Sequence, residues 1–212
     1  MPRYAFLGPE GTFTESALKQ LTVDSDELIA YANVTATLNA VRAGETEFAL
    51  VPIENSVEGV VARTLDELAI GDPLVIVAET TIRVSFALLT RSGFNRNEIT
   101  QIATHPHAES QCRSYIAKHF PHAQIIPMSS TAAAAEAVAR GEYPAAIAAA
   151  NIAGKKDLEV IEDGIGDIKD AETRFVLVSK PGQIPARTGY DRTSLVAFIG
   201  ADHAGEIGRA HV

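Results

Sequence analysis

The segment Thr173-Arg174-Phe175-Val176-Leu177-Val178-Ser179 opens with a hydroxyl, a fixed positive charge and an aromatic ring, and continues as an apolar, β-branched run. Such a run is typical of a buried strand. Successive side chains of a strand point to opposite faces, so Thr173 and Phe175 share one face and Arg174 takes the other. A plain strand entrance with a surface arginine has the same pattern, so these residues alone do not establish a site.

Around this segment, the chain alternates short apolar runs with helical stretches, which is the pattern of an α/β fold with a largely parallel sheet. We expect strands at residues 3–7, 28–31, 48–53, 74–77, 82–89, 101–104, 123–127, 145–149, 158–161 and 173–179. We expect helices at residues 14–21, 35–43, 61–70, 106–120 and 131–140.

Two predicted strands in direct succession, 74–77 and 82–89, indicate a crossover into a second lobe. The first lobe then comprises about residues 1–78 and 167–180, and the second about residues 79–166. In such folds, strand ends and helix N-termini converge between the lobes. We therefore expect the ligand site in the interlobe cleft.

The composition limits the partners. The 212 residues carry a formal net charge of −9 with an isoelectric point near 5.1, which argues against nucleic acid or an anionic membrane as partner. No apolar run approaches the roughly 18 residues of a membrane span, and the first residues do not form a signal peptide, so we expect a cytoplasmic protein. Cys112 is the one cysteine, and we expect it to be buried and inert.

Three polar turns follow predicted strands, at Gly11-Thr12-Phe13-Thr14, Glu54-Asn55-Ser56 and Ser129-Ser130-Thr131. Each has a local explanation. The hydroxyl residues that suit a helix N-cap are Thr12, Thr14, Ser130 and Thr131. The residues that suit a turn bonded to its own backbone are Asn55 and Ser56. For any one of them we favour the cap or turn over a ligand contact, although several together after strand ends also fit a binding site.

The histidines invite a metal hypothesis, because His105 and His107 would share one face of a strand. Pro106 between them indicates the start of a helix instead. No carboxylate cluster completes a ligand set, so we interpret His105 as a helix cap or cleft-rim residue.

Five ordered motifs carry a resemblance to a known family. They are Gly8-Pro9-Glu10-Gly11-Thr12-Phe13-Thr14, Val51-Pro52-Ile53-Glu54-Asn55-Ser56-Val57-Glu58-Gly59, His105-Pro106-His107-Ala108-Glu109-Ser110-Gln111-Cys112, Ser129-Ser130-Thr131-Ala132-Ala133-Ala134 and Thr173-Arg174-Phe175. In this order, over about residues 3 to 180, the chain resembles the prephenate dehydratases. It departs from that family at Ala171, where asparagine is usual, and at His107, where glutamine is usual.

The resemblance implies a fold like that of the type II periplasmic binding proteins, with the active site in the interlobe cleft. It implies conversion of prephenate to phenylpyruvate, water and CO2, without a metal or redox cofactor, in a homodimer or homotetramer. This decarboxylative elimination needs a site that holds a dianion and helps a hydroxyl group to leave. Arogenate dehydratase, or a catalytically idle two-lobed small-molecule binding protein, is the alternative.

The resemblance also implies roles for particular residues. Thr173 would donate a hydrogen bond to the leaving oxygen, and Phe175 would pack on the substrate ring. Arg174 would bind a substrate carboxylate if the strand is bulged there, or else pair with Glu54. The remaining residues implied to bind substrate are Thr12, Thr14, Glu54, Asn55, Ser56, Ser130 and Thr131.

The end of the chain suggests a further unit. Residues 181–191 have the composition of a linker, and residues 192–212 resemble the first strand and helix start of an ACT domain. In the family that domain binds phenylalanine for feedback control. A strand and a helix stub cannot bury a core. We therefore expect a truncated ACT domain and no inhibition by phenylalanine.

Overall fold

The computed structural model describes residues 1–182 and 186–193, apart from the side chain of Lys155. Residues Met1–Gly182 form one compact unit, and the chain from Gln183 onward forms another. In that second unit, residues 186–193 contain neither helix nor strand, and the Asp191 carboxylate accepts hydrogen bonds from the backbone and hydroxyl of Thr188. The expected ACT segment lies outside the described residues except for residues 192 and 193.

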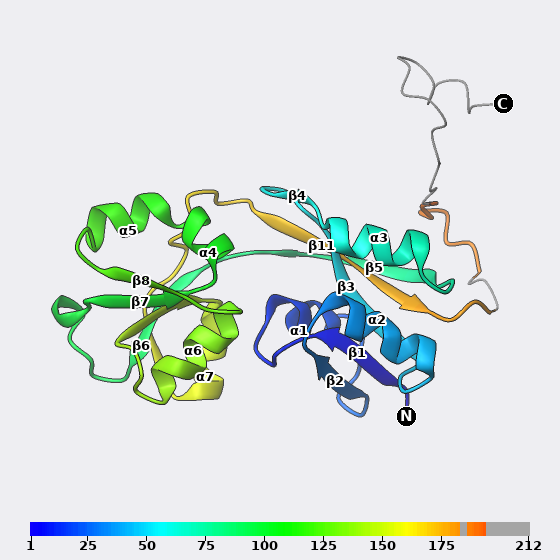
Figure 1. Cartoon of the computed structure of the whole chain (residues 1–212), viewed down its shortest axis with the longest axis horizontal. Coiled ribbons are helices and arrows are strands. Elements are labelled where there is room, and N and C mark those ends of the chain that lie inside the picture. The colour runs from blue at the N-terminus through cyan, green and yellow to red at the C-terminus, as the bar shows by residue number, and fades with distance from the viewer. Residues whose placement is uncertain (183–185, 194–212) are drawn as a thin grey trace, which may run out of the picture. The chain divides into compact units, whose positions relative to one another are not determined.

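The compact unit contains two mixed sheets, so the predicted two-lobed α/β class is confirmed (Figure 1). The first sheet has the order β2-β1-β3-β11-β5. Its strands are β1 (Arg3–Leu7), β2 (Glu27–Tyr31), β3 (Phe48–Asn55), β5 (Val75–Arg83) and β11 (Glu172–Ser179), with β4 (Gly59–Val60) paired to the end of β3. Strands β1, β2 and β3 are parallel, and β11 is antiparallel to both β3 and β5.

The second sheet has the order β10-β6-β9-β7-β8. Its strands are β6 (Ala87–Arg91), β7 (Gln101–Thr104), β8 (Gln124–Pro127), β9 (Ala145–Ala148) and β10 (Leu158–Glu162). Pairing is parallel from β9 through β7 to β8 and antiparallel from β9 through β6 to β10. The expectation of a largely parallel sheet is therefore met in only part of each sheet.

Helices cover both faces of each sheet. The first sheet has α1 (Phe13–Leu18) on one face, and α2 (Val34–Ala43) and α3 (Ala62–Ile70) on the other. The second sheet has α4 (Pro106–Gln111) and α5 (Arg113–His119) on one face, and α6 (Thr131–Ala139) and α7 (Ala153–Lys156) on the other. Short 3-10 turns η1 (Arg96–Glu98) and η2 (Ala150–Ile152) complete the elements of this unit.

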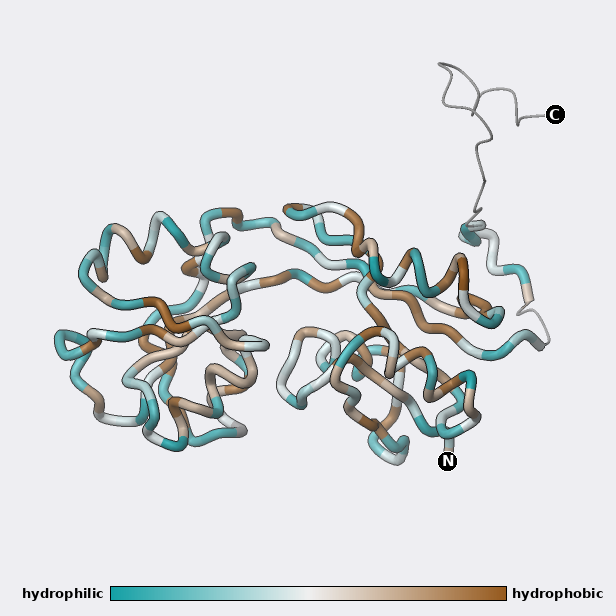
Figure 2. The backbone as a smooth tube through the Cα atoms, in the orientation of Figure 1, coloured by the Kyte–Doolittle hydropathy of each residue, from teal (hydrophilic) through white to brown (hydrophobic). Residues whose placement is uncertain are grey.

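Apolar stretches follow the strands and the inner helix faces, while the turns are mostly hydrophilic (Figure 2). Around α6, small residues allow close packing: Ala146, Ala132 and Ala135 are fully buried together with the neighbouring strand. The small side chains predicted for the strand near residues 145–149 therefore have the expected effect. A core built largely of alanine methyl groups is stabilised by many close contacts rather than by large side chains.

The crossover lies later than predicted. The predicted strands 74–77 and 82–89 are instead the single strand β5, which stays in the first sheet up to Arg83, and β6, which begins at Ala87 in the second. Ile82 lies opposite Thr173 in β11, so the predicted lobe boundary at residue 78 is wrong by about five residues. The two segments that connect the lobes, after β5 and before β11, are hydrogen-bonded to each other where they leave the first sheet: Val84 N–H donates to the Ala171 carbonyl at 2.8 Å.

Among the described residues, no helix combines the length and the apolar character needed to cross a membrane.

Candidate active site

Thr173 lies near the start of β11, opposite Asn55 of β3 and Ile82 of β5. Its side chain is buried, and Asn55 Nδ2 donates a hydrogen bond of 2.8 Å to its Oγ1. A threonine hydroxyl has one hydrogen and two acceptor lone pairs. Since Oγ1 accepts from Asn55, the hydroxyl hydrogen stays available for another acceptor.

The orientation of the Asn55 amide is fixed by its own turn. Asn55 Oδ1 accepts from Val57 N–H at 2.8 Å and from Glu58 N–H at 3.1 Å. Two backbone donors require the oxygen on that side, so the amide nitrogen must face Thr173. The predicted turn at Asn55 is confirmed, and it serves a long-range contact across 118 positions of the sequence.

Ser56 ties the same turn to β11. Its Oγ accepts from Glu172 N–H, and its own N–H donates to the Glu172 carbonyl, each at 2.9 Å. The hydroxyl therefore bonds a distant backbone rather than its own turn. These bonds bring Asn55, Ser56 and Thr173 together, as the hypothesis of a shared site requires.

Arg174 points away from the Thr173 face and lies opposite Glu54, with 3.6 Å between Nη2 and Glu54 Oε2. Immediately beyond this pair, the register with β3 shifts by one residue, at Ile53. Arg174 Nε is buried and has no hydrogen-bond partner among the described residues. The structure therefore contains the bulge and shows the pairing with Glu54, which was the alternative to carboxylate binding; binding of a substrate carboxylate by Arg174 stays a prediction.

Phe175 is part of the hydrophobic core. Its ring is 1% exposed and belongs to the cluster beneath α1 that contains Leu18, Leu50 and Phe6. A side chain so enclosed does not offer a ring face to a ligand. The predicted role of Phe175, packing on a substrate ring, is therefore corrected: the ring belongs to the core beneath α1.

The turn between β1 and α1 satisfies its polar groups locally. Thr12 is the N-cap of α1, since its Oγ1 accepts from Glu15 N–H at 3.4 Å and donates to the Leu7 carbonyl at 3.2 Å. Thr14 is buried in the first turn of the helix. The Glu15 carboxylate accepts from Gly11 N–H and from the Lys19 ammonium. The structure confirms the cap at Thr12 and does not place Thr14 as a cap.

The start of α6 comes close to this turn from the other lobe. Ser130 is the N-cap of α6 and accepts from Ala133 N–H at 3.0 Å, while Thr131 is half-buried in the first turn. A Cβ on Gly11 would lie 3.8 Å from the Ala132 methyl and 2.5 Å from Ile152. Gly11 also has a φ of +85°, so both the available space and the backbone conformation require glycine here.

Two further contacts join the lobes. The ring of Phe13 packs edge-on against Phe86 with centroids 5.6 Å apart, and Asn151 Nδ2 donates to Ser16 Oγ at 2.9 Å. The sequence motifs contained Phe13 but gave no signal for Phe86 or Asn151, because their partners lie far along the chain.

Glu58 makes another contact that sequence reasoning missed. Its carboxylate contacts His107 Nδ1 and lies 3.4 Å from Gln111 Nε2, both on α4 of the second lobe. His105 is the N-cap of α4, as predicted, with Nδ1 accepting from His107 N–H at 3.3 Å. Burial, followed by the neighbouring His107, lowers the pKa of His105. Glu58 lies inside one of the five sequence motifs, so the sequence singled out the residue but did not identify its partner on α4.

Within residues 1–182 and 186–193, no three histidine, cysteine or carboxylate side chains lie close enough together to hold a metal ion. Cys112 is fully buried, as predicted, and burial together with Asp167 raises the pKa of its thiol to about 12. The thiol therefore stays protonated at neutral pH and is a poor nucleophile.

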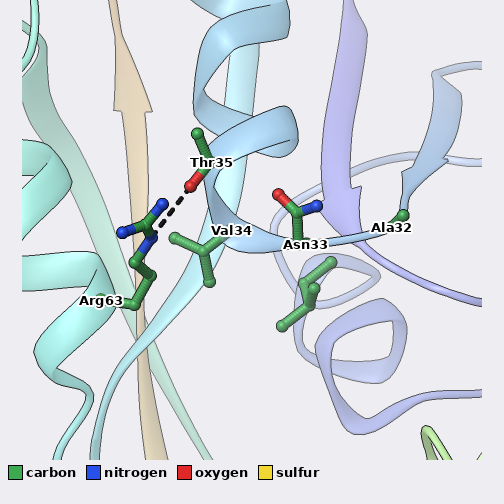
Figure 3. Close-up of a pocket in the computed structure, with 6 residues that line it drawn as sticks. Ala32, Asn33, Val34, Thr35 and Arg63 are labelled. Atoms are coloured by element: carbon green, nitrogen blue, oxygen red, sulfur yellow. Dashed lines mark hydrogen bonds between the residues drawn. The ribbon is translucent and has the colours of Figure 1, made fainter.

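Two open hollows lie near these residues. One, of about 550 Å³, is confined to the first lobe and is lined by Leu7, Ala32, Asn33, Val34, Thr35 and Arg63 (Figure 3). Arg63 Nε donates to Thr35 Oγ1 at 3.0 Å, and its guanidinium lies near Glu67, so its charge is already matched. None of the predicted site residues lines it.

The other hollow, of about 380 Å³, is formed by both lobes. Its lining residues are Phe13, Ser16, Gln20, Thr81, Ile82, Arg83, Ser85, Ala149, Ala150 and Asn151. It adjoins the Phe13–Phe86 contact, and Ile82 connects it to Thr173 through the strand pairing.

A family model described as prephenate dehydratase matches residues 4–183. The chain belongs to the prephenate dehydratase family. A relative from Amycolatopsis methanolica named prephenate dehydratase is 46% identical over 198 residues, which cover 93% of this chain and 64% of the relative. The chain thus spans less than two thirds of the length of that family member.

Solved structures agree with this membership. The prephenate dehydratase from Arthrobacter aurescens, in complex with L-Phe, is 46% identical with a TM-score of 0.88, covering 97% of this chain and 69% of that protein. GqqA, a novel type of quorum-quenching acylase, is 29% identical with a TM-score of 0.72, covering 87% of this chain and 66% of that protein. The fold of the family is therefore found with more than one named activity.

Proposed function

We propose that this chain is the catalytic part of a prephenate dehydratase, acting between its two lobes. The observation that carries the proposal is the hydrogen bond from Asn55 to Thr173 Oγ1, which leaves a directed hydroxyl donor at the start of β11. Family membership supports the substrate, prephenate, and the products phenylpyruvate, water and CO2. No step of this elimination requires oxidation or reduction.

Thr173 is assigned as the donor to the departing hydroxyl group. Threonine is too weak an acid to give up its proton at neutral pH, but a directed hydrogen bond strengthens as negative charge develops on the leaving oxygen. Asn55 donates to the same oxygen, which polarises the hydroxyl and holds its direction. A preformed donor costs no reorganisation at the moment when the C–O bond breaks.

Neutral donors are assigned to the two carboxylates of the substrate. Ser130 and Thr131 lie at the start of α6, where backbone dipoles favour negative charge, and Ser56 lies beside Thr173. Arg174 faces away from Thr173 and its Nε is buried, so it is assigned to the pair with Glu54 rather than to the substrate. Thr12 and Thr14 are assigned to the stability of the turn instead, because the Thr12 hydroxyl bonds nearby backbone and the Thr14 side chain is buried.

The test is to give the purified chain prephenate at neutral pH with a chelator present and to follow phenylpyruvate by its absorbance in alkali. The proposal expects turnover above the spontaneous rate. Failure of a folded sample to exceed that rate would contradict it. A parallel assay with arogenate decides between the two dehydratases.

Assembly and location belong to the same proposal. We infer a homodimer or homotetramer in the cytoplasm, on the basis of the family resemblance. Light scattering of the purified chain measures the number of copies, and a single-copy mass would contradict the assembly.

A further inference from the structure

The Glu58 side chain connects the second lobe to the hydrogen bonds that orient Thr173. Its carboxylate contacts His107 and Gln111 of α4. Its backbone N–H donates to Asn55 Oδ1 at 3.1 Å, and the other end of the Asn55 amide donates to Thr173 Oγ1 at 2.8 Å. One residue therefore takes part in a contact between lobes and in the turn beneath the hydroxyl.

We propose that Glu58 is a positioning residue that aligns Thr173 when the lobes are together. The inference rests on the proposed function and assigns Glu58 a part in it. When α4 holds the carboxylate, the backbone of Glu58 is held where its N–H reaches Asn55, and Asn55 Nδ2 stays directed at Thr173. When the lobes are apart, the contact with α4 is lost, and the turn keeps only its own bonds and the bonds between Ser56 and Glu172.

The geometry favours this role over a purely surface ion pair. Glu58 is in the loop between β3 and β4, and Val57 of the same loop packs against the core of the second lobe. Both residues donate to Asn55 Oδ1, so both backbone donors that orient the amide belong to residues in contact with the other lobe. Small displacements of a catalytic donor have large effects on rate.

The kinetic test compares Glu58→Ala in two backgrounds. The alanine variant keeps the backbone N–H and loses the carboxylate. In the chain with Thr173, we expect kcat to fall roughly 10-fold with KM changed less than about twofold, because only alignment is lost. In a Thr173→Val background, we expect no further fall, since no hydroxyl remains to be aligned. Equal falls in both backgrounds would overturn the proposal.

Variants of the second lobe complete the kinetic test. His107→Ala with Gln111→Ala should reproduce the effect of Glu58→Ala, and His107→Gln, which keeps a donor of similar reach, should restore most of the rate. Glu27→Ala on β2 and the exposed His122→Ala are matched controls and should leave kcat unchanged. A kcat of His107→Gln no higher than that of His107→Ala would count against a role for the contact between Glu58 and His107.

Amide exchange tests the inference without any turnover. Hydrogen–deuterium exchange by NMR at Val57 and Glu58 reports the two bonds to Asn55 Oδ1 directly. We expect both amides to exchange several-fold faster in the His107→Ala, Gln111→Ala variant than in the parent chain or in His122→Ala. Unchanged exchange would overturn the positioning role, whereas absence of prephenate turnover with faster exchange would count only against the proposed function.

Discussion

The turns after β1 and after β3 stand at the same edge of the first sheet, yet their polar side chains are used differently. After β1, Thr12 and Glu15 bond groups within a few residues of themselves. After β3, Asn55 reaches Thr173 and Glu58 reaches α4. The first turn mainly builds a helix start, whereas the second joins distant parts of the chain. Neighbouring turns can therefore use their polar side chains for a local helix start in one case and for long-range contacts in the other.

The largest effect expected is on stability, at Phe175. Replacing this core ring by alanine should lower the free energy of unfolding by about 3–5 kcal/mol, because a large cavity forms beneath α1. Urea unfolding measures the loss. Phe175→Leu serves as the milder variant, and its kcat/KM should stay within about threefold of the parent chain. A large rise in KM in the leucine variant would indicate that Phe175 contacts the substrate after all.

Thr173→Val should separate chemistry from folding on the same strand. The valine keeps the shape and loses the donor, so kcat for prephenate should fall by about 100-fold or more. The unfolding free energy should change by only about 1–2 kcal/mol, the cost of leaving Asn55 Nδ2 without its acceptor. Steady-state kinetics and urea unfolding give the two numbers. Thr173→Ser retains the hydroxyl and is the matched control, with most of the activity expected to remain.

Much of the local structure was predictable because its causes are local. The caps at Thr12, Ser130 and His105 and the turn at Asn55 follow from side chains bonding nearby backbone. The end of α2 at Gly44, whose φ is +79°, follows from the conformational freedom of glycine.

Two errors have tertiary causes. The polar residues Glu79 to Thr81 looked like a break between strands, but β5 is an edge strand whose alternate side chains are more exposed. The predicted helix 106–120 is interrupted at Cys112. There Asp167 N–H donates to the Gln111 carbonyl at 2.6 Å, and the Asp167 carboxylate accepts from Ser114 N–H, so a distant segment replaces helical bonds.

The site was predictable in its members but not in its arrangement. Motif resemblance selected Asn55, Ser56 and Thr173, which the structure brings together. It also selected Phe175, whose burial depends on the packing of α1. Alternation along a strand identifies a shared face, but it does not say where that face passes from the core to the cleft.

A smaller effect is expected in the β1–α1 turn. Thr12→Ala removes the N-cap of α1 and should cost about 1 kcal/mol of unfolding free energy, while kcat/KM stays within about threefold. Ser130→Ala, which removes the cap of α6, provides a comparison with a similar loss of stability. A fall in kcat/KM of Thr12→Ala beyond about 10-fold would break the contrast between the two turns.

The smallest effect concerns Cys112. Because its thiol is buried and its pKa is raised to about 12, a disulfide-exchange reagent at pH 8 should label the native chain far more slowly than the chain in urea. Absorbance of the released chromophore gives both rates. Equal rates would place the thiol at the surface and would weaken the description of α4 and α5 as one packed layer.

The most direct test of the account is a double-mutant cycle on Asn55 and Thr173, with kcat for prephenate as the readout. Asn55→Ala alone should lower kcat roughly 10- to 100-fold through misalignment of the hydroxyl. If Asn55 acts through Thr173, the double variant with Thr173→Val will be no slower than Thr173→Val alone. If instead the two losses multiply, Asn55 acts independently, and the claim that it orients the catalytic hydroxyl is contradicted.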